Sequence, residues 1–172
     1  MTLASFVRNV TAFDRRYTDT LGVDLQAREL PLYAFLSNFF TGGEEVEVGD
    51  ARLRATAAGL GVARAEVLEA FSIKSIQLYI GPTGSGAGVH YHMDALNLMT
   101  AGKKRWHLFP PAHTRYTAKP PAAWVQEQRQ LDGVPRFECT QRAGDVLYVP
   151  EMWGHATENE AFSVGVALEV IM

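Results

Sequence analysis

The chain has 172 residues, of which 47% are hydrophobic and 20% charged, as expected for one soluble globular domain with a sizeable core. The net charge of −3 gives no reason to expect nucleic acid or an anionic membrane as a partner. The single cysteine, Cys139, excludes an internal disulfide. No apolar run approaches the roughly 20 residues that span a bilayer, and the first residues lack the pattern of a secretory signal. We therefore expect a soluble protein, cytoplasmic by default.

The first 72 residues predict a helical amino-terminal part. In residues 29–40 the large apolar side chains recur near helical spacing, which favours a helix. Two alanine-rich stretches, residues 51–60 and 63–71, favour two short helices. The acidic stretch at residues 44–50 is most simply a loop or an edge strand.

Residues 73–172 predict a β-rich core. Short runs of alternating apolar and polar residues are separated by turn residues, with one helical insert at residues 120–131. Six to eight strands at this spacing predict a sandwich or small barrel with helices packed outside. No repeat or linker divides the sequence, so we expect a single domain over residues 1–172. The predicted strands lie in the segments SIQLYIG, GVHYHMD, LMTA, KKRWHLF, FECTQR, DVLYVP and WGHATENEAFSVGVALEV.

The stretch GVHYHMD carries the first candidate metal ligands. His90, His92 and Asp94 stand at alternate positions, so on a strand their side chains share one face. Neighbouring members would be about 6.6 Å apart along the strand, close enough to converge on one ion. A further ligand must come from elsewhere, and His155, after the strand DVLYVP, is the best remaining candidate. These residue types suit a non-haem iron site, and zinc could use the same set.

Other residues with reactive side chains have simpler interpretations. A single histidine is more often a surface or core residue than a ligand, and we interpret His107 and His113 in this way. Cys139 has no companion that suggests nucleophilic catalysis. The glycine-rich GPTGSGAG lacks the Gly-Lys-Ser/Thr ending of a phosphate-binding loop and leads into a strand.

Two segments together resemble a known family: GPTGSGAGVHYHMDALNLMTAGKKRWHLFPP and RAGDVLYVPEMWGHATEN. They are similar to the core of the JmjC-type cupin oxygenases, over about residues 75–168. The resemblance implies a double-stranded β-helix, a jelly roll of the cupin type, and a site for iron(II) and 2-oxoglutarate. In the family, the first iron histidine stands nine residues after a glycine like Gly81, which matches His90. The last iron histidine follows a GDVLYxP strand and a tryptophan, which matches His155.

The second ligand departs from the usual His-x-Asp pattern of the family, because His90 is followed by His92. Two ligand sets remain open. The first is His90, His92 and His155. The second is shifted by two residues and uses His92, Asp94 and His155. A JmjC subgroup that includes a lumenal member also has His-x-His here, at the same distance from the GxKRW turn, and this similarity favours the first set.

The resemblance also implies where the cosubstrate binds. The lysine of GxKRW matches Lys104, which would pair with the distal carboxylate of 2-oxoglutarate, and Asn97 would bond the same molecule. Lys104 and Trp106 alternate on one strand, so both point inward or both outward. Ala167 and Ala87 stand where many relatives carry threonine, and each missing hydroxyl removes a hydrogen bond of about 1 kcal/mol.

The resemblance implies an iron(II)- and 2-oxoglutarate-dependent oxygenase, most simply a hydroxylase. Two alternatives stay open: a three-histidine dioxygenase that does not use 2-oxoglutarate, and a catalytically inactive JmjC-like scaffold. The substrate would be a protein or a small molecule. We expect no nucleic-acid partner and no membrane, and the family suggests a homodimer.

Overall fold

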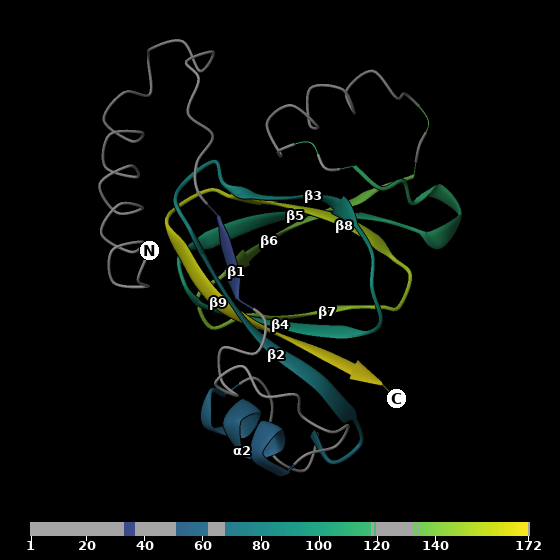
Figure 1. Ribbon diagram of the computed structural model, residues 1–172. Coiled ribbons are helices and arrows are strands. Elements are labelled where there is room, and N and C mark those ends of the chain that lie inside the picture. The colour runs from purple at the N-terminus through teal and green to yellow at the C-terminus, as the bar shows by residue number, and fades with distance from the viewer. Residues whose placement is uncertain are drawn as a thin grey trace.

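Two facing antiparallel β-sheets form the body of the protein, and one helix packs against the larger sheet (Figure 1). The computed structural model describes residues 33–36, 51–61, 68–117, 119, 133 and 135–171. The larger sheet contains, in spatial order, β1 (Ala34–Leu36), β2 (Ser72–Gly81), β9 (Ser163–Ile171), β4 (Ala95–Ala101) and β7 (Val146–Val149). The smaller sheet contains β3 (Gly86–His90), β8 (Gly154–Asn159), β5 (Lys103–Phe109) and β6 (Phe137–Arg142). The helix is α2 (Ala51–Gly59), and a short 3₁₀ turn covers Pro111–His113.

The order of the strands is that of a double-stranded β-helix. From β2 to β5 the chain passes from one sheet to the other at every connection, and it does so again from β6 to β9. Every described strand pair is antiparallel. The predicted fold class, mainly β in a jelly roll with a peripheral helix, is therefore confirmed. Gly102 lies in the tight turn between β4 and β5 and Gly144 in that between β6 and β7, and both have a φ of 92°, which favours glycine.

The outer face of the larger sheet buries its apolar side chains under α2. Ala57 of the helix and Leu68 pack against alternate residues of β2 and β9. In both strands, successive side chains point to opposite faces, so one set packs on the helix and the other faces the smaller sheet. The buried members of this cluster are Ala57, Leu68, Ile73, Ile76, Leu98, Val166, Leu168 and Val170.

The space between the sheets contains polar as well as apolar side chains. On β5, Lys104, Trp106 and Leu108 are all buried, so the lysine points inward together with the tryptophan. Leu108 and Trp106 pack against Val149 of the opposite sheet. The inward row of β5 therefore has a lysine at one end, which brings a charged group into the interior.

The helix predicted over residues 29–40 is wrong at its centre, where Ala34–Leu36 form strand β1. Antiparallel pairing with the edge of β2 supplies backbone hydrogen bonds and outweighs the helical spacing. The helix predicted over residues 51–60 is confirmed as α2. The second predicted helix, residues 63–71, lies mostly outside the described residues. The helical insert at 120–131 and the acidic stretch at 44–50 lie entirely outside them. Among the residues that the structure describes, no helix is both long and apolar enough to cross a membrane.

Candidate metal centre

Three histidines from separate parts of the fold meet between the sheets. His90 is the last residue of β3 and lies directly opposite His155 of β8 in the antiparallel register. His92 follows two residues later, where the chain leaves the smaller sheet. One ring nitrogen from each of the three lies within 4.8 Å of those of the other two. The ring of His155 lies 4.2 Å from that of His90 and 4.7 Å from that of His92, between centroids. This spacing allows all three side chains to bind one ion.

Backbone carbonyls orient each of these imidazoles. The Nδ1 atoms of His90, His92 and His155 lie 2.9, 2.7 and 3.1 Å from carbonyl oxygens. These carbonyls belong to Gly88, Met93 and Trp153, respectively. A carbonyl oxygen only accepts hydrogen bonds, so Nδ1 carries the proton in the neutral ring, and the lone pair is on Nε2. All three rings therefore have the tautomer that a metal-binding histidine needs.

Burial favours the neutral form of His90 and His155. It lowers the pKa of His155 to about 3, and the nearby His90 and His92 lower it further than the Trp153 carbonyl raises it. The pKa of His90 is also lowered, mainly by burial. A neutral imidazole is the form that binds a metal ion, because protonation removes the lone pair. The pocket therefore presents unprotonated nitrogen donors near neutral pH.

Asp94 points away from the three histidines. Its Oδ1 accepts hydrogen bonds from the Tyr148 hydroxyl at 2.5 Å and from the Glu151 amide at 3.0 Å. The prediction that one strand continues through Asp94 is wrong, because β3 ends at His90 and the chain then crosses to the larger sheet. Alternation along a strand thus no longer places Asp94 beside His92. The structure brings together the side chains of the first predicted ligand set and not those of the second.

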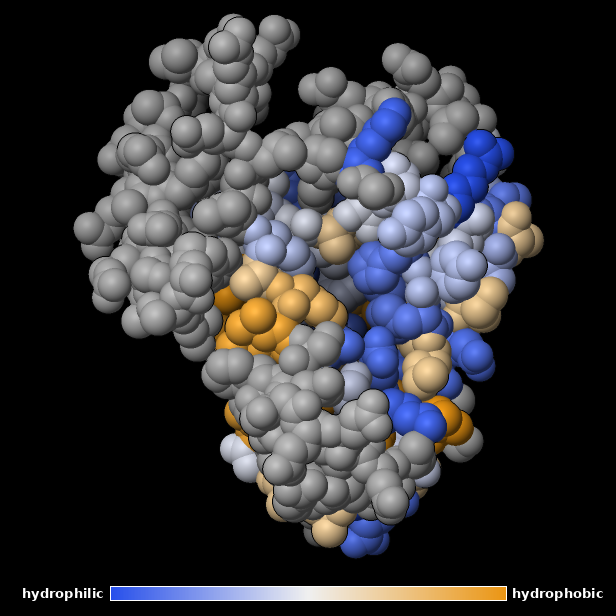
Figure 2. Space-filling model, viewed as in Figure 1, coloured by the Kyte–Doolittle hydropathy of each residue, from blue (hydrophilic) through white to orange (hydrophobic). Residues whose placement is uncertain are grey.

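The three histidines lie at the wall of a cavity of about 360 Å³ between the two sheets. The lining combines aromatic and small apolar residues with a few polar groups. Figure 2 shows hydrophobic and hydrophilic residues meeting at the hollow near the centre of the drawn face. The lining residues are Tyr33, Phe35, Tyr79, Ala87, Gly88, His90, His92, Asn97, Lys104, Trp106, Tyr116, Thr117, His155, Thr157 and Ala167.

Lys104 is the buried cation of this cavity, and only 1% of its surface is exposed. Its ammonium group donates to the Tyr33 hydroxyl at 3.2 Å and lies 3.4 Å from the centre of the Tyr79 ring. No carboxylate within the described part of the chain lies within ion-pairing distance of it. Burial lowers its pKa well below the usual value. A buried ammonium group without an anionic partner is costly, so this cavity suits an anionic ligand.

The other residues predicted for the cosubstrate also line the cavity. Asn97 of β4 is buried beside Ala167 of β9, its partner in the sheet register. Ala87 and Ala167 therefore face the predicted pocket without a hydroxyl group.

Sequence analysis missed several polar contributors to this cavity, and three of them lie at the Lys104 end. Tyr33 and Tyr79 surround the Lys104 ammonium, and Thr157 bonds both Tyr33 and the Ala87 amide. Thr157 stands two residues after His155 on β8, so alternation along that strand could have identified it. Tyr33 gave no such signal, because its segment was predicted to be a helix.

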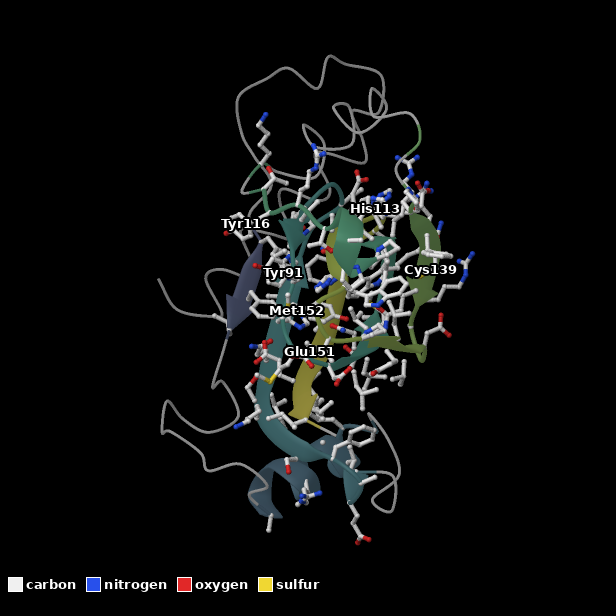
Figure 3. All side chains as sticks on the ribbon, turned by 90° about the vertical axis from the view of Figure 1, so that its right-hand side faces the viewer. Tyr91, His113, Tyr116, Cys139, Glu151 and Met152 are labelled. Carbon is white, nitrogen blue, oxygen red and sulfur yellow. The ribbon has the colours of Figure 1, made fainter. Side chains whose placement is uncertain are left out.

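Residues that the sequence set aside stay outside the cluster. His107 lies on the opposite face of β5 from Lys104, and its Nδ1 is 3.4 Å from a Glu138 carboxylate oxygen. His113 and Cys139 are exposed. Figure 3 shows His113 and Cys139 away from the row of labelled side chains that runs from Tyr116 to Glu151.

A jelly roll with three converging imidazoles and a buried lysine is a cupin-type pocket whose donors could hold a metal ion. The chain belongs to the JmjC domain family, whose family model matches residues 60–171. This match begins directly after α2 and covers all strands from β2 to β9 and the three histidines. Membership in the JmjC oxygenase family, predicted from the sequence, is therefore confirmed.

Three relatives with established names illustrate the similarity. Human JmjC domain-containing protein 8 is 38% identical over 89 residues, which is 49% of this chain and 34% of the relative. The bifunctional arginine demethylase and lysyl-hydroxylase psr-1 of Caenorhabditis elegans is 30% identical over 108 residues, or 51% of this chain and 27% of the relative. Human 2-oxoglutarate and iron-dependent oxygenase JMJD4 is 31% identical over 98 residues, which is 48% of this chain and 23% of the relative. The matched segment thus spans about a third or less of these relatives.

Proposed function

We propose that this protein is an iron(II)- and 2-oxoglutarate-dependent oxygenase, most simply a hydroxylase. One observation carries the proposal: three converging imidazoles line the same cavity as a buried lysine that has no carboxylate partner among the described residues. This arrangement supports a metal site and a dicarboxylate site next to each other in the cavity. The name of one relative, a 2-oxoglutarate and iron-dependent oxygenase, supports the same assignment.

In this proposal, His90, His92 and His155 hold the metal through their Nε2 atoms. Zinc or another divalent ion could bind the same three nitrogens. Lys104 pairs with the distal carboxylate of 2-oxoglutarate, and the Asn97 amide bonds the same molecule. The Tyr33 hydroxyl, which accepts from Lys104, fixes the direction of the ammonium group. Trp106 closes the wall, with its ring 5.7 Å from that of His155 and its Nε1 donating to Gln141 at 2.9 Å.

When bound, iron(II) and 2-oxoglutarate would supply the oxidising chemistry, in which molecular oxygen is divided between two products. One oxygen atom enters the substrate C–H bond as a hydroxyl group, and the other enters succinate, with release of carbon dioxide. The chain's own residues bind and orient the reactants and exclude water from the cavity.

The test is formation of succinate from 2-oxoglutarate by the purified chain with iron(II) and ascorbate in air. We expect turnover by the wild-type chain and its loss in His155→Ala. His113→Ala is the matched control, because it removes an exposed histidine that lies outside the cluster. Bound iron without any succinate formation would contradict the proposal.

A second candidate is a catalytically inactive JmjC-like scaffold that acts by binding partners. The alanines at positions 87 and 167 favour it, because both face the cavity without the hydroxyl groups common in relatives. Failure to bind iron or zinc at micromolar concentrations would support this candidate.

A third candidate is a dioxygenase that does not use 2-oxoglutarate. The ligand set favours it, because three neutral histidines leave a bound metal ion with its full charge. Oxygen consumption that persists in Lys104→Ala and without 2-oxoglutarate would support it.

A further inference from the structure

Asp94 is a buried carboxylate beside the metal centre that the proposed function does not use. Only 7% of its surface is exposed, and no described lysine, arginine or histidine forms an ion pair with it. Its oxygen instead accepts from the Tyr148 hydroxyl and the Glu151 amide. The first of these bonds raises the pKa of Tyr148 to about 12. Both donors come from the segment around the β7 end, which leads into β8.

The same two segments are joined by a second bond. The Met152 amide donates to the His92 carbonyl at 3.0 Å, next to the bond between Glu151 and Asp94. Met152 has a φ of 62°, an unfavourable value for a residue with a side chain, so its contacts must hold it there. Tyr91, Met152 and Glu151 follow one another along one face of the molecule in Figure 3.

The joined segments contain the carbonyls that orient two of the imidazoles. The Met93 carbonyl accepts from His92, and the Trp153 carbonyl accepts from His155. Met93 immediately precedes Asp94, and Trp153 lies two residues after the Glu151 amide that Asp94 accepts. A shift of either segment would therefore turn the imidazole that it orients.

We propose that Asp94 is a positioning residue of the metal centre. Its carboxylate holds residues 92–94 against residues 151–153 and so fixes the His92 and His155 imidazoles, without binding the ion itself. This inference rests on the proposed metal site and assigns to Asp94 a role different from the ligand role that the shifted set would give it.

The experiment measures cobalt(II) affinity of the full chain by the visible absorption of the bound ion. Asp94→Ala removes both hydrogen bonds, whereas Asp94→Asn keeps an oxygen of the same shape that can accept them. Asp145→Ala is the matched control, because the Asp145 carboxylate accepts from the Arg142 amide in the turn between β6 and β7. The free energy of unfolding of each variant is measured in parallel.

We expect Asp94→Ala to weaken cobalt binding by about 10- to 100-fold and to change the absorption spectrum. Asp94→Asn should restore affinity to within about threefold of wild type. The Asp145→Ala control should bind cobalt like wild type, even if it loses as much free energy of unfolding as Asp94→Ala does. If the Asp94 carboxylate were itself a metal ligand, Asp94→Asn would bind cobalt as weakly as Asp94→Ala, and that result overturns the proposal. Unchanged affinity in Asp94→Ala overturns it as well.

If Asp94→Ala does not fold, Tyr148→Phe carries the test. It removes one donor from a ring that is 41% exposed, and we expect weaker cobalt binding by about threefold or more. Unchanged affinity in this variant contradicts the positioning role. A wild-type chain that binds no cobalt contradicts the metal centre itself, which separates that failure from failure of the Asp94 assignment.

Discussion

Replacement of Lys104 by methionine separates the requirements of the ligand from those of the fold. Methionine keeps an unbranched apolar chain of similar length but removes the ammonium group, which is buried against Tyr33 and Tyr79. The ligand-free variant should be at least as stable as wild type, because it removes a buried charge that pairs with no carboxylate in the described part of the chain. Its affinity for 2-oxoglutarate should nevertheless fall sharply.

The size of the effect follows from the buried position of Lys104. Loss of one member of a buried, hydrogen-bonded charge pair costs about 2–5 kcal/mol of binding free energy. Since about 1.4 kcal/mol corresponds to a factor of ten, Lys104→Met should weaken 2-oxoglutarate binding by about 30- to 4,000-fold.

The assay is calorimetric titration with 2-oxoglutarate without oxygen, with manganese in place of iron. The matched control is Lys103→Met, because Lys103 is an outward neighbour that pairs with Glu160 at 2.8 Å. The control should bind within about twofold of wild type, since exposed ion pairs contribute little. Equal binding by wild type and Lys104→Met would refute the assignment of Lys104 as the carboxylate anchor.

Stability as a function of pH gives an independent check on Lys104. Because burial lowers its pKa, the unfolded chain takes up a proton more readily than the folded chain. Wild-type stability should therefore rise as the pH increases toward the ordinary lysine value of 10.5, relative to Lys104→Met. Parallel pH profiles of the two proteins would contradict burial of the charge.

Three further predictions concern the metal, the outer face of β5 and the packing beneath the lysine. His90→Ala should reduce cobalt affinity at least about 100-fold in an absorption titration, and retained affinity would contradict the three-histidine set. Burial lowers the pKa of His107, so the free energy of unfolding should fall as the pH drops below the usual histidine value of 6.5. In urea unfolding at pH 5, His107→Gln should lose less of this free energy, relative to neutral pH, than wild type does. An equal loss would refute this prediction. Gly165→Ala would place a methyl group 2.1 Å from the Tyr79 hydroxyl and should cost about 2 kcal/mol in thermal unfolding, whereas Gly59→Ala, with nothing within 4 Å, should be neutral or stabilising.

The strands and their turns could be predicted because their signals are local. Alternating residues and the glycines at positions 102 and 144 define β4 to β7 without knowledge of the partner strands. The strand Ala34–Leu36 could not be predicted, because it forms only by pairing with the edge of β2. Its apolar spacing fitted a helix, and the tertiary contact decided between the two.

In the candidate site too, some features could be predicted from the sequence and others depend on tertiary contacts. The approach of His90 to His155 follows from family resemblance together with the antiparallel pairing of β3 and β8. The direction of Asp94 could not be predicted from alternation, because the strand ends where the chain changes sheets. The contact of Tyr33 with Lys104 joins residues 71 positions apart and has no local signal.

The most direct test of the metal centre is a crystal structure of the chain soaked with manganese(II) or cobalt(II), with the ion located by anomalous scattering. The metal centre described above predicts one peak within about 2.3 Å of the Nε2 atoms of His90, His92 and His155, on the cavity side of the rings. A peak bound by the Asp94 carboxylate, or no peak among the three imidazoles at saturating metal, would contradict it.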